Sequence, residues 1–216
     1  AGVGRDRVTG IVLAGGRSSR FGTEKLAATS DGQTLLERAV ERVESVAGTI
    51  LIAGPVEPTT RFRHVPPVRF IDDAEPFAGP LAALAGTLRE IATEFAIVVG
   101  ADMPGLVPAV LQSMLDRLAM SADIDAVLLD AVPGDARGDG PPKQQVLPVA
   151  LRVGPASETA AASLAAGDRS LVRFLGRLRV AEIPVEEWLQ LDPVGESTFD
   201  IDIPVDLERF RAREIR

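Results

Sequence analysis

Residues 13 to 25 read LAGGRSSRFGTEK and follow the apolar run Val8 to Val12. The segment combines three glycines with two arginines and a lysine, and its residues show neither helical nor strand periodicity. Glycine lets a backbone approach a ligand closely because it has no Cβ, and clustered cations repel one another unless an anion lies among them. The pattern therefore predicts a phosphate-binding loop at the end of a buried strand.

Strand patterns and amphipathic helix patterns alternate along the rest of the chain. We expect strands at residues 8–14, 49–53, 68–71, 95–99, 124–129, 146–151 and, at a sheet edge, 180–183. We expect helices at residues 35–47, 81–92, 156–166, 170–178 and 204–214, and one more that begins at Pro108. This order predicts an α/β protein with a parallel sheet, helices on both faces and a ligand site at the carboxyl ends of the strands.

Side-chain patterns also predict local contacts. Thr34 and Glu37 have the spacing of a capping box at the start of the first of these helices. The single tryptophan, Trp188, is expected in the core, and the single histidine, His64, in a surface loop. The core face of the helix that begins at Pro108 is predicted to consist of Val110, Leu111, Met114, Leu115 and Leu118.

Composition excludes several classes of function. The formal net charge of -8 disfavours binding to duplex nucleic acid, which is held mainly through phosphate contacts from Lys and Arg. The chain has no cysteine and one histidine, so it has no thiol nucleophile and cannot build a zinc site from several histidines. No apolar run approaches the length that spans a membrane, and we expect a cytoplasmic protein.

Two common phosphate motifs do not fit the segment. A Walker loop requires Gly-Lys-Ser/Thr, whereas two residues separate Gly22 from Lys25. The dinucleotide fingerprint could begin at Gly2 and Gly4, but Arg7 occupies its third glycine position and the match precedes the first strand. We therefore interpret Gly2 and Gly4 as part of a flexible terminus.

The segment instead resembles the signature of the nucleotidyltransferases that activate sugars and cofactors. That signature runs Leu-Ala-Gly/Ala-Gly, then Arg, Met/Phe and Gly, then Lys, and the matching residues are Leu13, Ala14, Gly15, Gly16, Arg20, Phe21, Gly22 and Lys25. The resemblance implies that all of these except Phe21 bind the nucleotide and that Arg20 and Lys25 take part in catalysis. From the residues alone, a surface turn rich in glycine and arginine remains the alternative.

A second match concerns the GPLA sequence at residues 79–82. In the subfamily that transfers GMP to molybdopterin, an acidic residue precedes Gly-Pro-Leu-Ala within a short distance, as Asp73 does here. The resemblance implies that Asp73, Gly79, Pro80 and Leu81 bind the nucleotide. The Gly-Pro step could instead be no more than the start of a helix.

A third match is Gly100-Ala101-Asp102-Met103-Pro104, directly after the strand predicted at residues 95–99. A carboxylate at the carboxyl end of a strand faces the crevice where ligands bind, and its hard oxygen suits Mg²⁺. The segment resembles the Asp-Met-Pro of the same guanylyltransferases, which implies that Asp102 binds Mg²⁺ and the nucleotide and takes part in catalysis. The alternative is that Asp102 caps the next helix.

Near the end of the chain, residues 199–204 resemble the family's Asn-x-Asn-Thr-Pro segment, with Asp200 and Asp202 in place of the asparagines. Asp202 could complete the metal shell opposite Asp102, or it could cap a helix before Pro204. The family binds its acceptor in the second half of the chain, which implies acceptor contacts from Lys143, Gln145 and Arg169.

Along the whole chain, the resemblance is to the MobA-like molybdenum cofactor guanylyltransferases. It implies a single domain over residues 1–216, a Rossmann-like three-layer sandwich of the nucleotide-diphospho-sugar-transferase type with a mostly parallel mixed sheet of about seven strands. Residues from about 8 to 130 would bind the nucleotide, and residues from about 131 to 216 would complete the sheet and bind the acceptor. The implied reaction transfers GMP from GTP to molybdopterin, with Mg²⁺ as cofactor, pyrophosphate as second product and transient partners in cofactor delivery.

Three other functions remain open. A cytidylyltransferase of the same pathway would use CTP, although Gly15 leaves more room for a purine than the alanine that such enzymes tend to carry. A sugar-phosphate nucleotidyltransferase could use the same loop. A non-catalytic module that binds GTP or the cofactor would explain the looser resemblance in the second half.

Overall fold

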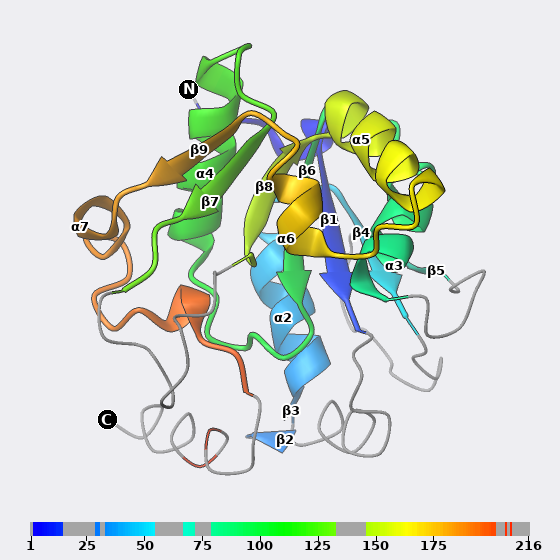
Figure 1. Ribbon diagram of the computed structural model, residues 1–216. Coiled ribbons are helices and arrows are strands. Elements are labelled where there is room, and N and C mark those ends of the chain that lie inside the picture. The colour runs from blue at the N-terminus through cyan, green and yellow to red at the C-terminus, as the bar shows by residue number, and fades with distance from the viewer. Residues whose placement is uncertain are drawn as a thin grey trace, which may run out of the picture.

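The computed structural model describes residues 2–14, 29–30, 33–54, 67–71, 79–132 and 146–201, together with residues 206 and 208. Its centre is a seven-stranded sheet in the order β5-β4-β1-β6-β8-β7-β9 (Figure 1). The strands are β1 (Val8–Leu13), β4 (Thr49–Ala53), β5 (Val68–Ile71), β6 (Phe95–Gly100), β7 (Ala126–Leu129), β8 (Val149–Arg152) and β9 (Val180–Ile183). A separate pair joins β2 (Thr29–Ser30) to β3 (Gln33–Thr34).

Strand direction makes the sheet mostly parallel. β1 pairs in parallel with β4 and β6, and β4 pairs in parallel with β5. β8 runs antiparallel to both of its neighbours, β6 and β7, while β7 and β9 are parallel. From β1 the chain continues to β4 on one side, and from β6 it continues to β7 on the other side. The gap between β1 and β6 is therefore the topological switch point, the place where α/β sheets bind ligands at the carboxyl ends of their strands.

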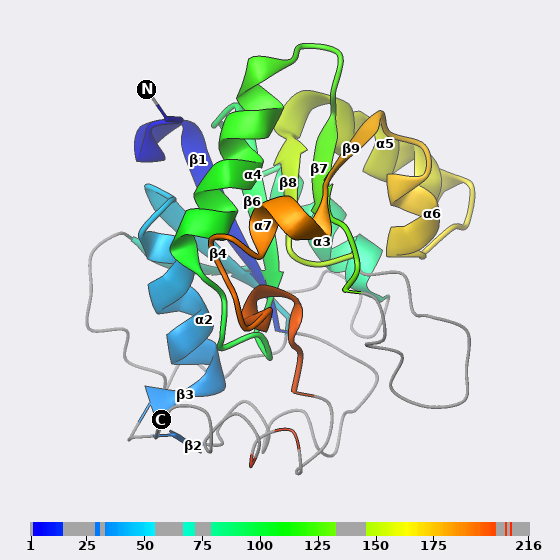
Figure 2. The same cartoon turned by 90° about the vertical axis from the view of Figure 1, so that its left-hand side faces the viewer.

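Helices cover both faces of the sheet, which confirms the predicted three-layer fold (Figure 2). They are α2 (Leu35–Glu44), α3 (Pro80–Leu88), α4 (Pro108–Met120), α5 (Val153–Ala165), α6 (Leu171–Leu175) and α7 (Val185–Trp188). Two short 3-10 helices, η1 (Arg5–Arg7) and η2 (Glu196–Thr198), lie near the two ends of the chain. Within the described residues, no helix has the length and apolar character needed to cross a membrane.

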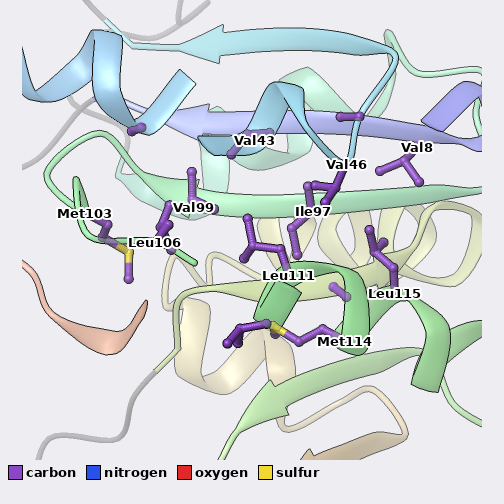
Figure 3. Packing of buried hydrophobic residues seen from close by; sticks show 14 of the residues in the cluster. Val8, Val43, Val46, Ile97, Val99, Met103, Leu106, Leu111, Met114 and Leu115 are labelled. Atoms are coloured by element: carbon purple, nitrogen blue, oxygen red, sulfur yellow. The ribbon is translucent and has the colours of Figure 1, made fainter. Parts of the chain in front are cut away.

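The two apolar clusters follow the alternation of side chains along β1 and β6. Val12 and Ile97 point toward α2 and α4, where Val43, Leu111 and their neighbours pack against them (Figure 3). Ile11 and Val98 point to the opposite face, into the cluster that contains residues of α3, α5 and α6. All residues of β1 and β6 are buried, as expected for central strands of a parallel sheet that is covered on both faces.

Several predictions of local structure are confirmed. The strands at 49–53, 68–71 and 180–183 have the predicted bounds, and β9 lies at a sheet edge. α4 begins at Pro108, and its five predicted core residues are fully buried. The Thr34 hydroxyl accepts the N–H of Glu37 and the Glu37 carboxylate accepts the N–H of Thr34, which completes the capping box. Trp188 is fully buried, and its indole N–H donates to the carbonyl oxygen of Asp130 at 3.1 Å.

Other predictions were wrong in their bounds. β8 begins at Val149, three residues later than predicted, because Pro148 has no N–H to donate to a ladder. α3 ends at Leu88, after which Glu90 and Ile91 close i to i−3 turns; Ile91 still packs on the core, so the helical spacing continues beyond the helix. α5 begins earlier and α6 is shorter than predicted, and α7 was not predicted.

The first residues of the chain are also held more firmly than predicted. The N–H of Val3 donates to the Asp116 carboxylate at 2.7 Å, and its carbonyl accepts the Gln112 amide at 3.2 Å. Val3 is buried against α4, so the interpretation of this end as flexible is wrong for residues 2–7. His64 and the loop at residues 133–142 lie outside the described residues, as does most of the helix predicted at 204–214.

Candidate nucleotide-binding site

The end of β1 is fixed between the ends of its two neighbours. The N–H of Ala14 donates to Ala53 at the end of β4 at 2.8 Å, and the carbonyl of Leu13 accepts the N–H of Ala101 beyond β6 at 3.0 Å. Leu13 is buried and Ala14 is half-buried. The glycine- and cation-rich segment therefore leaves the sheet directly at the switch point.

The other residues predicted in this segment lie outside the described part of the chain. They are Gly15, Gly16, Arg20, Gly22 and Lys25. Their roles in binding the triphosphate stay predictions, although the position from which the segment starts is the one that these roles require.

Asp102 lies in the turn that follows β6. The N–H of Met103 donates to the carbonyl of Gly100 at 3.2 Å, and the Met103 side chain is buried beneath the turn. A Cβ built at Gly100 would lie only 2.5 Å from Oδ1 of Asp102, so the carboxylate lies directly over the end of β6. A side chain at position 100 would displace it.

The structure excludes the capping alternative for Asp102. The N-cap of α4 is Val107, five residues after Asp102. Asp102 is therefore placed by the strand end and not by the helix. Its half-buried carboxylate lies beside the end of β1, where the predicted triphosphate loop begins.

The Gly-Pro step forms one margin of the same end of the sheet. Gly79 is the N-cap of α3 with φ +96°, a conformation that residues with an L side chain rarely adopt, and Pro80 occupies the first turn. The step therefore does start a helix. Leu81 is fully buried in the apolar cluster beneath it, so only its backbone remains available to a nucleotide. Asp73 lies outside the described residues.

Gly79 also lies close to a residue from the second half of the chain. A Cβ at Gly79 would lie 3.9 Å from both the Cβ and the carbonyl oxygen of Arg169. Arg169 is exposed and follows α5 in the chain. A residue predicted to bind the nucleotide and a residue predicted to bind the acceptor are thus neighbours. The other two predicted acceptor residues, Lys143 and Gln145, lie outside the described residues.

The neighbouring Asp168 holds the turn that carries Arg169. Its carboxylate accepts Nε of Arg173 at 2.9 Å and the N–H of Ser170 at 3.1 Å, and it pairs with Arg177 at 3.2 Å. The hydrogen bond from Arg173 is the main cause that lowers the pKa of Asp168 to about 2. Asp168 is therefore ionised at neutral pH and fixes the connection between α5 and α6.

Sequence analysis missed a buried carboxylate at the other margin of the site. Asp192 is 3% exposed and accepts the N–H groups of Gly195 and Ser197. The sequence Asp-Pro-Val-Gly at residues 192–195 is a turn signal that could have indicated it. What the sequence does not reveal is the position of this turn beside the loop that carries Asp102.

The donor chemistry near Asp102 suits Mg²⁺. Mg²⁺ prefers hard oxygen ligands and takes one or two carboxylates together with phosphate oxygens and waters. Among the described residues, no three His, Cys, Asp or Glu side chains converge on a common point. Asp102 provides one such carboxylate, and the N–H of Ile201, the residue before Asp202, donates to the carbonyl of Asp102 at 3.0 Å. Asp202 itself is outside the described residues, so its role as metal ligand or helix cap stays open.

Residues 10–181 match the family model described as the MobA-like NTP transferase domain. The chain belongs to the MobA-like NTP transferase family. The match includes Leu13 and Asp102, at the paired ends of β1 and β6, and the neighbouring residues Gly79 and Arg169.

Relatives of this MobA-like chain extend over nearly its whole length. A protein of Chloroflexus aggregans named as a probable molybdenum cofactor guanylyltransferase is 30% identical over 95% of this chain and 94% of its own. A molybdenum cofactor guanylyltransferase of Cupriavidus metallidurans is 29% identical over 86% of this chain and 88% of its own. The crystal structure of molybdopterin-guanine dinucleotide biosynthesis protein A from Archaeoglobus fulgidus superposes with a TM-score of 0.71 at 25% identity, and covers 96% of this chain and 98% of its own.

Proposed function

We propose that this protein transfers GMP from GTP to molybdopterin and so forms the guanine dinucleotide cofactor and pyrophosphate. The observation that carries the proposal is the meeting of the ends of β1 and β6. It brings Asp102 to the start of the segment that holds the predicted triphosphate ligands. The names of the relatives that match nearly the whole chain support GTP and molybdopterin as the substrates.

The chemistry needs no strong base. The phosphate of the acceptor is already an anion at neutral pH; one of its oxygens forms a bond to the α-phosphorus of GTP, and the bond from that phosphorus to the bridging oxygen breaks to release pyrophosphate. The barrier arises mainly from bringing anions together and aligning them, so positioning and charge neutralisation supply most of the rate. The chain has one histidine and no cysteine, and this reaction requires neither residue type.

Each group of residues has a separate task in this proposal. The N–H groups of Gly15 and Gly16, together with Arg20 and Lys25, hold the triphosphate, while the Gly79 turn and the start of α3 border the nucleotide. Mg²⁺ held by Asp102, with Asp202 as the proposed second carboxylate, would neutralise charge on the triphosphate.

The acceptor approaches from the side of Arg169. Its guanidinium can bind the phosphate of molybdopterin in a bidentate manner, and the proximity of Arg169 to Gly79 supports an acceptor site that adjoins the nucleotide site. Lys143 and Gln145 are proposed to complete the acceptor contacts.

The decisive experiment offers the purified protein each of the four nucleoside triphosphates with molybdopterin and Mg²⁺ and follows pyrophosphate release. Turnover is expected with GTP, and mass spectrometry should detect the guanine dinucleotide product. Turnover with CTP but not GTP would overturn the choice of base. Activity with hexose 1-phosphates but not with molybdopterin would favour a sugar-phosphate nucleotidyltransferase, and GTP binding without turnover on any acceptor would favour a non-catalytic module.

A further inference from the structure

The buried carboxylate of Asp192 closes a short turn before the end of the described chain. Its Oδ1 accepts the N–H of Gly195 at 3.1 Å, and its Oδ2 accepts the N–H of Ser197 at 2.7 Å. Gly195 adopts φ +74°, which a glycine permits without strain. Both carboxylate oxygens are therefore used in fixing the backbone of residues 192–197, which we call the Asp192 turn.

The Asp192 turn packs against residues 101–107, which we call the Asp102 loop (Figures 1 and 2). The Ser197 hydroxyl accepts the N–H of Val107 at 3.0 Å, and Ser197 is fully buried. Glu196 lies so close to Gly105 that a Cβ at Gly105 would be 2.8 Å from the Cβ of Glu196. The contact leaves room for glycine only, so the turn and the loop hold each other in place.

The same segment then reaches Asp102 itself. Beyond the turn, Phe199 and Ile201 are buried, and the N–H of Ile201 donates to the carbonyl of Asp102 at 3.0 Å. The Asp192 turn and this hydrogen bond are two fixed points on one stretch of chain. Both hold the backbone between residue 192 and Ile201 against the Asp102 loop.

We propose that Asp192 is a positioning residue for the metal site: it fixes the turn that aligns the segment ending at Ile201 with Asp102. The inference rests on the proposed function, in which Asp102 holds Mg²⁺. Ligand positions in such sites must be held within a fraction of an ångström, and residues that orient ligands typically change metal affinity by roughly 10-fold to 100-fold when they are replaced. Asp192 touches neither substrate nor metal and acts only through the backbone that it holds.

Asp125 offers a matched control within the same chain. It is also a buried carboxylate, 5% exposed, and it accepts three hydrogen bonds from the backbone and guanidinium of Arg179. It precedes β7, at the end of the sheet opposite to Asp102. Replacing Asp125 should destabilise the fold without reaching the Asp102 loop.

The test compares Asp192→Asn, Ser197→Ala and Asp125→Asn with the wild-type protein. Electron paramagnetic resonance measures Mn²⁺ binding, as a stand-in for Mg²⁺, to each protein with a non-hydrolysable GTP analogue. Thermal unfolding is measured in parallel. We expect Asp192→Asn to weaken Mn²⁺ binding roughly tenfold, because one N–H of the turn then faces an amide NH₂. Ser197→Ala keeps the turn but leaves the N–H of Val107 without its acceptor, so it should weaken Mn²⁺ binding in the same direction and also lower the unfolding temperature.

The control decides the outcome. If Asp192→Asn and Asp125→Asn both lower the unfolding temperature and neither changes Mn²⁺ affinity, Asp192 has a structural role only. A wild-type complex that binds no Mn²⁺ would also overturn the inference, because no metal would be there to position. A wild-type protein that binds Mn²⁺ but forms no guanine dinucleotide would instead overturn the proposed reaction, while the comparison of the variants would still decide the role of Asp192.

Discussion

The N–H of Ile201 donates to the carbonyl oxygen of Asp102 at 3.0 Å, although these residues lie in opposite halves of the chain. One of them follows the strand that ends at the switch point, and the other belongs to the last described stretch of the chain. The hydrogen bond therefore joins the turn that carries Asp102 to the residue that precedes Asp202 in the sequence. In the proposed metal site, Asp102 thus depends on contacts from both parts of the chain.

Replacing Asp102 should separate binding from chemistry. Asp102→Ala is expected to retain GTP binding through the segment at residues 13–25 and to lower kcat by at least roughly 100-fold, because the proposed Mg²⁺, which would neutralise charge in the transition state, loses its carboxylate ligand. Isothermal titration with GTP and pyrophosphate release measure the two parts. Asp123→Ala serves as the control, since the Asp123 side chain is 98% exposed. Undiminished turnover in Asp102→Ala would exclude Asp102 from catalysis.

Gly100→Ala should displace the carboxylate of Asp102, which is two residues further along the chain. The new methyl group would lie 2.5 Å from Oδ1 of Asp102, so the carboxylate must move, and kcat should fall without a change in the overall fold. Gly154→Ala is the matched control: its Cβ would have no neighbour within 4 Å, and alanine at this helical position should add up to about 1 kcal/mol of stability. Steady-state kinetics and urea unfolding compare the two variants. Equal kcat in both would show that the close approach at Gly100 has no role in activity.

Arg169→Ala should weaken binding of the acceptor and leave binding of GTP unchanged. A charge-assisted hydrogen bond contributes about 1.5 kcal/mol or more, so the KM for molybdopterin should rise roughly tenfold or more. The KM for GTP reports on the nucleotide side of the site. Arg117→Ala, which removes an exposed ion pair with Glu187, is expected to change neither KM value. A rise in the KM for GTP alone would assign Arg169 to the nucleotide instead.

The stability contribution of Asp168 should disappear in acid. The folded state lowers the pKa of Asp168 from 3.8 to about 2, mainly through the hydrogen bond from Arg173. Its ionised form therefore stabilises the fold above the unfolded pKa, and this contribution is lost as the pH falls through the folded pKa, between about 4 and 2. The free energy of unfolding of Asp168→Asn should be lower than that of the wild-type protein at pH 7, and the difference should narrow over this range. A difference that is independent of pH would contradict the assignment.

Local signals account for the parts of the fold that the sequence predicts well. The capping box at Thr34, the proline at the start of α4 and the β-branched run of β1 each specify an element through contacts within a few residues. The bounds of β8 and the presence of α7 depend on contacts made elsewhere in the chain. Trp188, for example, is the last residue of α7, and its indole N–H donates to the carbonyl oxygen of Asp130. Residues 185–188 are too few to show a helical periodicity in the sequence.

The candidate site likewise has some features that local sequence specifies and others that depend on distant contacts. The start of the motif at residues 13–25 and the position of Asp102 could be predicted from the sequence, because the first follows the end of β1 and the second follows the end of β6. The contact of Gly79 with Arg169 and the packing of the Asp192 turn on the Asp102 loop could not, since each joins residues that are far apart in sequence. Geometry also excluded the helix cap that the sequence left open for Asp102, because Val107 occupies that position.

In the seven-stranded sheet that the structure describes, β8 runs antiparallel to its neighbours, and this limits how the architecture can change. β8 comes after residue 131, yet it lies between β6 and β7, which both precede it in the chain. A protein truncated after β7 would leave the backbone edge of β6 exposed, and such edges promote aggregation. The part of the chain that carries Arg169 therefore cannot be removed or exchanged without disrupting the sheet. New acceptors are expected to arise through substitutions within loops, and not through recombination that exchanges one half for another.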